Sequence, residues 1–209
     1  MLCGYVVLVL VLTAFGYGLI HAAPFAGLRD LDDDVNRWLA EHRTGALDTI
    51  TAFWTTAINT LPAVVVALLV ELRLSLWRRW RDVVVVVSGL ALELSVFLTV
   101  NALVDRPRPD VERLGELPHT SSFPSGHVAA TIVLYGSVAL FVSLSRRRAA
   151  VQWLAWSAVV VFAGSVAFSR VYRGMHHPSD VVVGALLGVA CLSVAVLATR
   201  LWTEPDGQP

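Results

Sequence analysis

Apolar residues dominate this chain in long runs, and short polar stretches separate one run from the next. A helix of about 20 residues crosses the hydrocarbon core of a bilayer, and six runs reach roughly that length. We predict spans at Leu2–Ala22, Thr51–Leu72, Asp82–Val104, Gly126–Leu144, Val151–Val171 and Asp180–Trp202. The pattern therefore predicts an all-α, polytopic membrane protein, a bundle of six transmembrane helices that forms one domain over residues 1–209.

The first apolar run and the polar stretch after it need separate interpretation. Leu2–Ala22 has no basic flank and is longer than the apolar part of a secretory signal, so we expect it to remain as a helix. The following stretch, Pro24–Asp48, carries an acidic run made of Asp30, Asp32, Asp33 and Asp34. We interpret it as an amphipathic segment at the membrane interface.

Composition narrows the class of protein further. Of the 209 residues, 56% are hydrophobic and 15% are charged, and the mean hydropathy is +0.67. These values exclude an ordinary soluble domain and make the lipid bilayer the first expected partner. The formal net charge is zero and the sequence has no basic tail, so we expect no nucleic-acid partner.

The placement of arginine predicts the orientation of the spans. Dense clusters follow the second and fourth spans, at Arg73, Arg78, Arg79 and Arg81 and at Arg146–Arg148. By the positive-inside rule these connections face the cytoplasm, and both termini then face it too. Arginines on the two sides are equal in number, so the prediction depends on the clusters.

Two features lie inside the predicted spans. Glu93 is in the middle of the third span, where an ionised carboxyl group is costly. It either stays protonated and hydrogen-bonds a neighbouring helix, which we favour, or it relays protons. Gly184 and Gly188 have the spacing that allows two helices to approach closely.

Candidate chemistry concentrates in three short stretches at span ends, which the predicted topology places on one extracytoplasmic surface. They are Asn101–Asp110 (NALVDRPRPD), Ser121–His127 (SSFPSGH) and Ser169–Asp180 (SRVYRGMHHPSD). Guanidinium groups are planar and permanently charged, which suits phosphate oxygens. We therefore expect a dense anion site with contributions from Arg106, Arg108, Arg170 and Arg173.

The start of the fourth span has the features of an anion cradle. Pro124 suits a helix entrance. Ser125, Gly126 and His127 follow at the positive end of the helix dipole, where backbone N–H groups are free to bind an anion. The alternative interpretation is an ordinary helix start that happens to be followed by a histidine.

The histidines raise the question of a metal site. Asp180 follows His176 by four residues, close enough to orient its imidazole, and His127 and His177 could join them as ligands. A divalent ion would, however, be repelled by the guanidinium groups that would attract a phosphate. Ser125 could serve as a nucleophile, but it has no evident base. We predict neither a metal nor a cofactor.

Together, the three stretches resemble the signature motifs of the type 2 phosphatidic acid phosphatases, which are lipid phosphate phosphatases related to the vanadium haloperoxidases. The family pattern is KxxxxxxRP, then PSGH, then SRxxxxxHxxxD. Matching positions here are Arg108–Pro109, Pro124–His127, Ser169–Arg170, His176 and Asp180. The resemblance covers the chain from about the third span to its end, and the first two spans carry no motif.

The resemblance implies a role for each matching residue. His176 would attack phosphorus and form a phosphohistidine, with Asp180 holding the ring and compensating its charge. His127 would protonate the leaving oxygen and later activate water. The equatorial oxygens of the phosphate would be held by Arg108, Arg170, Ser125 and the amide of Gly126. No metal is implied.

One position departs from the family pattern. Asn101 stands seven residues before Arg108, where the family has lysine. Asn101 can still donate a hydrogen bond to phosphate, and Arg106 or Arg173 could supply the missing charge. His177 lies outside the motif, and we interpret it as structural.

The sequence thus predicts hydrolysis of a lipid phosphate or diphosphate whose tail stays in the bilayer while its head group reaches the site. The resemblance suggests polyprenyl diphosphate, phosphatidic acid or phosphatidylglycerol phosphate, and we prefer the first. A non-catalytic lipid-phosphate binder or transporter is the alternative, motivated by Asn101. His127 and His176 argue against it, because binding alone needs arginines and amides. A vanadate-dependent haloperoxidase is disfavoured because those relatives are soluble.

Overall fold

The computed structural model describes residues 1–57, 59–115, 120–145 and 148–201, and within them every regular element is a helix. In chain order these are α1 (Leu2–His21), α2 (Ala26–Glu41), α3 (Gly45–Ala57), α4 (Thr60–Leu76), α5 (Trp80–Leu103), α6 (Gly126–Leu144), α7 (Ala149–Tyr172) and α8 (Pro178–Leu201). A turn of 3-10 helix, Ala23–Phe25, leads from α1 into α2. The all-α prediction is confirmed.

Five of the helices are long and apolar enough to cross a membrane, namely α1, α5, α6, α7 and α8. They coincide closely with five of the six predicted spans. The remaining predicted span, Thr51–Leu72, is divided between α3 and α4, which meet at 49°. Pro62 gives the physical reason, since it fits the first turn of α4 but lacks the N–H that a helix continuing from α3 would need there. The described residues hold five spans, or six if the bent pair counts as one.

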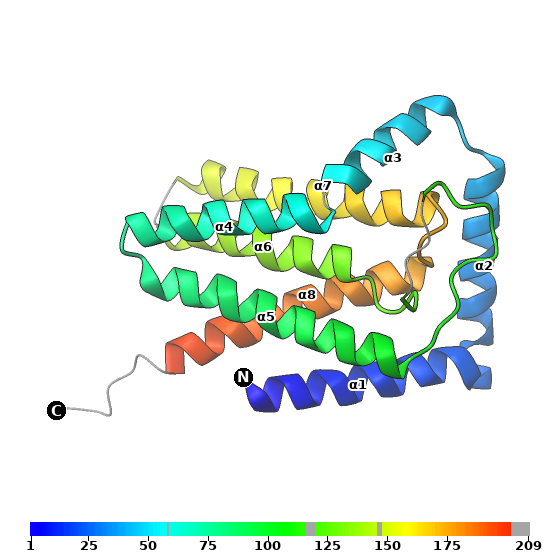
Figure 1. Ribbon diagram of the computed structural model, residues 1–209, viewed down its shortest axis with the longest axis horizontal. Coiled ribbons are helices and arrows are strands. Elements are labelled where there is room, and N and C mark those ends of the chain that lie inside the picture. The colour runs from blue at the N-terminus through cyan, green and yellow to red at the C-terminus, as the bar shows by residue number, and fades with distance from the viewer. Residues whose placement is uncertain (58, 116–119, 146–147, 202–209) are drawn as a thin grey trace.

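The centre of the bundle is the contact between α6 and α8, with α5 and α7 packed against them (Figure 1). Two glycines of α8 allow this contact. A Cβ atom at Gly184 would lie 2.4 Å from the carbonyl oxygen of Ser125, and one at Gly188 would lie 2.6 Å from that of Ala129. Because both obstacles are backbone atoms, these two positions fix how closely α8 approaches the start of α6.

The two ends of the bundle differ in character (Figure 1). One end holds the end of α8 and the connection from α4 to α5, where Arg78 and Arg79 lie, and α1 begins partway along the bundle and runs toward the other end. The three polar stretches gather at the opposite end, and α2 lies across the helix ends there. Arg146, Arg147 and Trp202, which entered the sequence predictions, lie outside the described residues.

The acidic run of helix α2 is not uniformly exposed. Asp32 and Asn36 are buried, whereas Leu31 and Trp38 are 56% and 58% exposed. The buried polar residues face the bundle, where α2 contacts α1, α7 and α8. The outer side is mixed, because Asp34 and Arg37 are exposed beside Leu31 and Trp38. The inner side makes specific polar contacts that hydropathy alone does not reveal.

Candidate active site

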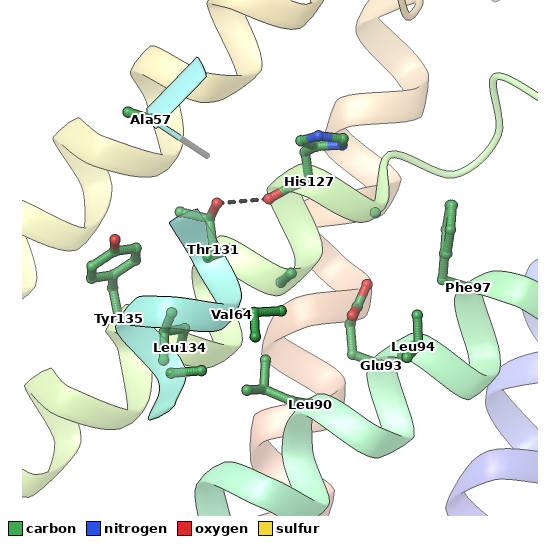
Figure 2. Close-up of a pocket in the computed structure, with 14 residues that line it drawn as sticks. Ala57, Val64, Leu90, Glu93, Leu94, Phe97, His127, Thr131, Leu134 and Tyr135 are labelled. Carbon is green, nitrogen blue, oxygen red and sulfur yellow. Dashed lines mark hydrogen bonds between the residues drawn. The ribbon is translucent and has the colours of Figure 1, made fainter. Parts of the chain in front are cut away.

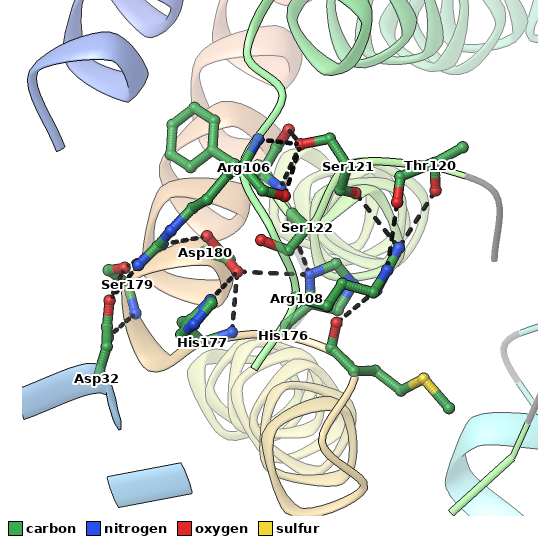
Figure 3. Close-up of polar contacts among 12 residues, drawn as sticks. Asp32, Arg106, Arg108, Thr120, Ser121, Ser122, His176, His177, Ser179 and Asp180 are labelled. Carbon is green, nitrogen blue, oxygen red and sulfur yellow. Dashed lines mark hydrogen bonds and ion pairs between the residues drawn. The ribbon is translucent and has the colours of Figure 1, made fainter. Parts of the chain in front are cut away.

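The first two polar stretches are joined by hydrogen bonds between their loops (Figure 3). The Ser122 N–H donates to the carbonyl oxygen of Arg106 at 3.0 Å, and the Ser122 hydroxyl donates to that of Pro107, also at 3.0 Å. The Ser121 hydroxyl donates to the Val104 carbonyl at 2.6 Å. These bonds hold the segment that follows α5 against the segment that precedes α6.

The third stretch contributes the end of α7 and the start of α8. Ser125 N–H donates to the carbonyl oxygen of Asp180 at 3.1 Å, so the beginnings of α6 and α8 lie side by side. His176 and His177 occupy the short connection between α7 and α8 and are buried. The structure therefore brings together the three stretches that the sequence singled out.

The surroundings of His176 fix one neutral tautomer of its imidazole ring. Its Nδ1 lies 2.6 Å from the carbonyl oxygen of Ser122. Because a carbonyl only accepts hydrogen bonds, Nδ1 carries the proton and Nε2 keeps its lone pair. Burial, followed by the positive charges of Arg170 and Arg108, holds the pKa of His176 well below its ordinary value. At neutral pH the ring is therefore uncharged and Nε2 is available as a nucleophile.

Asp180 lies beside His176 without a direct hydrogen bond to it. Its Oδ2 is 3.8 Å from His176 Nδ1 and instead accepts the His177 N–H at 2.8 Å, with His177 Nδ1 at 3.2 Å. The four-residue spacing does not produce the expected contact because His176 precedes the first residue of α8, Pro178, so the two side chains do not share a helix face. The Ser122 carbonyl, which no motif encodes, orients the ring instead.

Two buried donors at the site have no hydrogen-bond partner among the described residues. They are the Oγ of Ser125 and the Nε of Arg170. Ser125 is also the N-cap residue of α6 and makes no side-chain cap bond, so the first turn of α6, which begins at Gly126, lacks a side-chain acceptor from its own cap. An unpaired hydroxyl at a helix N-terminus and an unpaired guanidinium N–H in the last turn of α7 fit an anion such as phosphate.

Arg108 extends across the same region but is engaged with backbone acceptors. Its guanidinium group donates to the carbonyl oxygens of Thr120 and Ser121, each at 3.2 Å, and to that of Met175. Burial lowers the pKa of Arg108, while the negative charge of Asp180 opposes that effect. These contacts fix the direction of the guanidinium group near His176.

Two further residues predicted to bind phosphate also donate to protein acceptors. Asn101 Nδ2 donates to the carbonyl oxygens of Ser121 and Phe123 at 2.9 and 3.2 Å, which ties the end of α5 to the loop before α6. Arg106 is buried and donates to the carboxylates of Asp32 and Asp180. Where the family has lysine, this chain thus has an amide that supports the loop.

His127 lies in the first turn of α6 and lines an apolar cavity of about 290 Å³ between α4, α5 and α6 (Figure 2). Its walls include Leu90, Leu94, Phe97 and Leu134. Glu93 also lines the cavity and is only 4% exposed. Its Oε1 has no hydrogen-bond partner in the described part of the chain, so the expected bond to a neighbouring helix is not made by this oxygen.

Sequence reasoning missed three contributors to the site. The Ser122 carbonyl is a backbone group, which no pattern of residue types can reveal. Asp32 and Ser179, 147 positions apart in the sequence, bind each other, and both bind Arg106. Only the acidic run of α2 hinted at Asp32. The described residues contain no group of three or more His, Cys, Asp or Glu side chains placed to hold a metal.

The fold is that of a polytopic membrane protein. At one end of the bundle it gathers buried histidines, arginines and a helix start without a side-chain cap, which together suit an anion. The model of the PAP2 superfamily matches residues 82–204, more than half of the sequence. The chain belongs to this superfamily, and the resemblance seen in the motifs is confirmed.

Curated relatives match parts of the chain. The bacitracin transport permease protein BcrC of Bacillus licheniformis is 36% identical over 97 residues, 46% of this chain and 40% of that protein. The putative undecaprenyl-diphosphatase YbjG of Escherichia coli is 35% identical over 120 residues, 55% of this chain and 56% of that protein. The undecaprenyl-diphosphatase of Sulfolobus acidocaldarius is 39% identical over 84 residues, 39% of this chain and 36% of that protein. The matched part is thus about half or less of each relative's length.

Two solved structures share the fold. The transmembrane PAP2-type phosphatidylglycerolphosphate phosphatase of Bacillus subtilis superposes with a TM-score of 0.80 at 19% identity, over 97% of this chain and 98% of that one. Aquifex aeolicus LpxE gives a TM-score of 0.64 at 22% identity, over 78% of this chain and 93% of that one. At these identities the comparison establishes the helical architecture and its connectivity.

Proposed function

We propose that this protein is an integral membrane phosphatase that hydrolyses a lipid phosphate or diphosphate through a phosphohistidine at His176. The observation that carries the proposal is the pairing of His176 Nδ1 with the Ser122 carbonyl, which leaves Nε2 free in a region with unpaired buried donors. A binding site alone needs the donors but has no use for a neutral imidazole with a fixed free nitrogen.

The reaction would proceed in two displacements at phosphorus. Nε2 of His176 attacks, the bond from phosphorus to the leaving lipid oxygen breaks, and protonated His127 gives its proton to that oxygen. His127 then removes a proton from water, the water oxygen attacks phosphorus, and the bond from phosphorus to nitrogen breaks to release phosphate. Arg108, Arg170, Ser125 Oγ and the Gly126 N–H would stabilise the negative charge on the equatorial oxygens. Asp180 would compensate the charge that develops on His176.

The apolar cavity supports a lipid as the substrate. His127 both belongs to the site and lines this cavity, so a head group at His127 would be continuous with a hydrocarbon tail among Leu90, Leu94 and Phe97. Two of the curated relatives are named as undecaprenyl-diphosphatases, one of them putatively. We therefore favour a polyprenyl diphosphate, with the lipid monophosphate as leaving group, over phosphatidic acid or phosphatidylglycerol phosphate.

We also propose an orientation in the cell membrane. α8 ends at the end of the bundle that carries Arg78 and Arg79 between α4 and α5, α1 runs away from that side, and the candidate active site lies at the opposite end. If the arginine-rich end faces the cytoplasm, the site is extracytoplasmic and meets lipid head groups of the outer leaflet.

Phosphate release by purified protein from each of the three lipids, with a chelator present, tests the proposed function. We expect release to survive chelation, to be greatest with polyprenyl diphosphate, and to disappear in His176→Ala. His21→Ala is the matched control because His21 is an exposed histidine at the end of α1, and it should keep full activity. An acid-labile phosphoenzyme should form in wild-type protein and be absent from His176→Ala.

The alternative, a lipid-phosphate binder or transporter, gains some support from the relative named as a bacitracin transport permease. It predicts that folded protein binds the lipids without releasing phosphate. It also predicts that His176→Ala binds as tightly as wild type, since the anion donors are unchanged. Substantial phosphate release from His176→Ala would instead contradict the assignment of the nucleophile.

A further inference from the structure

Asp32 of α2 is buried at the end of the bundle and bonded to the helix that carries the candidate active site. It is only 1% exposed. Its carboxylate accepts the backbone N–H of Ser179 at 2.9 Å, the Ser179 hydroxyl, and an N–H of Arg106 at 2.7 Å (Figure 3). Asp32 lies outside residues 82–204, which match the family, and outside all three motifs.

One function of these contacts is to cap α8 from another helix. Ser179 is the second residue of α8, so its N–H has no acceptor within the helix. Asp32 supplies that acceptor, and its negative charge lies at the positive end of the helix dipole. The docking of α2 thereby fixes the first turn of α8, which carries Asp180.

A second function is electrostatic. Arg106 donates through one terminal nitrogen to Asp32 and through the other to Asp180, and all three side chains are buried. One guanidinium group is thus shared between two carboxylates, and the cluster keeps a net negative charge next to His176. Without the charge of Asp32, Arg106 would neutralise Asp180 alone, and Asp180 would compensate less of the positive charge that develops on His176.

We propose that Asp32 is a positioning residue for the reaction: through Arg106 and the start of α8 it holds Asp180 in place and preserves its charge for His176. The proposal rests on the proposed function of His176 and Asp180. It assigns to Arg106 a place behind the phosphate site rather than in it, and to Asp32, alone among the aspartates of the acidic run, a role in the chemistry.

The first test is Asp32→Asn, which keeps the shape and an acceptor for the Ser179 N–H but removes the charge. We expect kcat to fall roughly tenfold to a hundredfold, a range typical for residues that orient a catalytic ligand. KM should change much less, because Arg108, Arg170 and Ser125 are untouched. Asp34→Asn is the matched control on the same helix, since Asp34 pairs with Arg37 at the exposed surface, and it should behave as wild type.

A double-mutant cycle with Arg106→Gln separates this role from a purely structural one. If Asp32 acts through Arg106, the kcat of the double variant should be close to that of Arg106→Gln alone. Losses that multiply, or an Asp32→Asn variant with wild-type kcat, would overturn the proposal. If Asp32→Asn does not fold, Arg106→Lys decides, because it keeps the charge but cannot bridge both carboxylates as a guanidinium does; unchanged kcat in that variant would also overturn it.

Two further variants distinguish failure of this inference from failure of the proposed function. Turnover that survives in both His176→Asn and Asp180→Asn would refute the phosphohistidine mechanism itself. Turnover that is lost in both of these variants and unchanged in Asp32→Asn would leave the mechanism standing and refute only the role of Asp32.

Discussion

At the scale of single residues, the environment of His176 matters more than its presence in a motif. Any histidine at this position would satisfy the family pattern, but here a backbone carbonyl, two arginines and near-complete burial decide its state. The proton is confined to Nδ1 and the ring resists a second proton. The same features that prepare the nucleophile also make the folded protein sensitive to acid.

The acid sensitivity gives a prediction about stability. In the unfolded chain His176 has an ordinary pKa of about 6.5, whereas its pKa in the fold is well below that value. As pH falls below 6.5 the unfolded state therefore binds a proton that the folded state does not, which costs about 1.4 kcal/mol at a pH near 5.5. His176→Asn lacks this term. As the pH is lowered from 7.5 to 5.5, the melting temperature of His176→Asn in detergent should therefore rise relative to that of wild type. A difference between the two melting temperatures that does not change with pH would contradict the lowered pKa of His176.

Ser125 gives a prediction in which activity and stability separate. Its buried hydroxyl has no partner, so Ser125→Ala removes an unsatisfied group and should leave the melting temperature of the ligand-free protein unchanged or slightly higher. Loss of one donor to the transition state should lower kcat about a hundredfold. In the control, Ser137→Ala, the lost hydroxyl bonds only a carbonyl of its own helix, and kcat should be unaffected. Full activity in Ser125→Ala would remove this residue from the anion site.

At the scale of elements, the contact between α6 and α8 sets the geometry on which the site depends. Ser125 of α6 and Asp180 of α8 are joined through a backbone hydrogen bond, and Gly184 lies against the Ser125 carbonyl. A side chain at Gly184 must push the two helices apart, because the obstacle is backbone and cannot rotate away. The spacing of small residues therefore serves the site as well as the packing.

Alanine substitutions along α8 and α7 test this dependence. Gly184→Ala should destabilise the protein by roughly 1–3 kcal/mol, as overpacked contacts do, and should also lower kcat by displacing Ser125. Gly164→Ala on α7 is the control, since a Cβ there meets nothing within 4 Å. We expect its melting temperature to equal or exceed that of wild type. Equal behaviour of the two variants, measured by thermal unfolding and phosphate release, would contradict the role of the α6–α8 contact.

Much of the element level could be predicted from the sequence, for a physical reason. Five spans follow directly from apolar length, because the bilayer imposes that length on any helix that crosses it. The remaining predicted span, Thr51–Leu72, is divided at Pro62. The proline is visible in the sequence, but a hydropathy window averages over it and does not detect the break. The three motifs lie in the connection between the third and fourth predicted spans and in that between the fifth and sixth. Two spans separate these connections, so both were predicted to lie on the same side of the membrane.

The remaining features of the site depend on tertiary contacts that local patterns do not encode. Asn101 was expected to replace a phosphate-binding lysine, yet its amide supports the loop at Ser121 and Phe123. Arg106 and Arg108 are two residues apart and chemically identical, and only the fold shows that the first is bound to carboxylates while the second lies among backbone carbonyls. Asp32 looked like one of four equivalent aspartates.

At the scale of the whole molecule, the candidate active site is assembled from parts that lie far apart in the chain. The segment after α5, the start of α6 and the turn between α7 and α8 meet at one end, and α2 lies across that end (Figure 1). The long helices place the site at their ends, and α2 contributes buried polar contacts there. The cavity beside His127 extends from this end into the region between α4, α5 and α6.

The contact of Asp32 with Arg106 also constrains how this protein can be recombined with its relatives. A chimaera that takes residues 82–204 from this chain and the preceding helices from another member would carry every signature residue. It would nevertheless bury Arg106 with only one of its two carboxylate partners, Asp180, because the other, Asp32, belongs to the replaced segment. Positions 32 and 106 should therefore be taken from the same parent protein. If the parent that supplies the first helices has no acidic residue facing position 106, Arg106 should be replaced by a neutral residue.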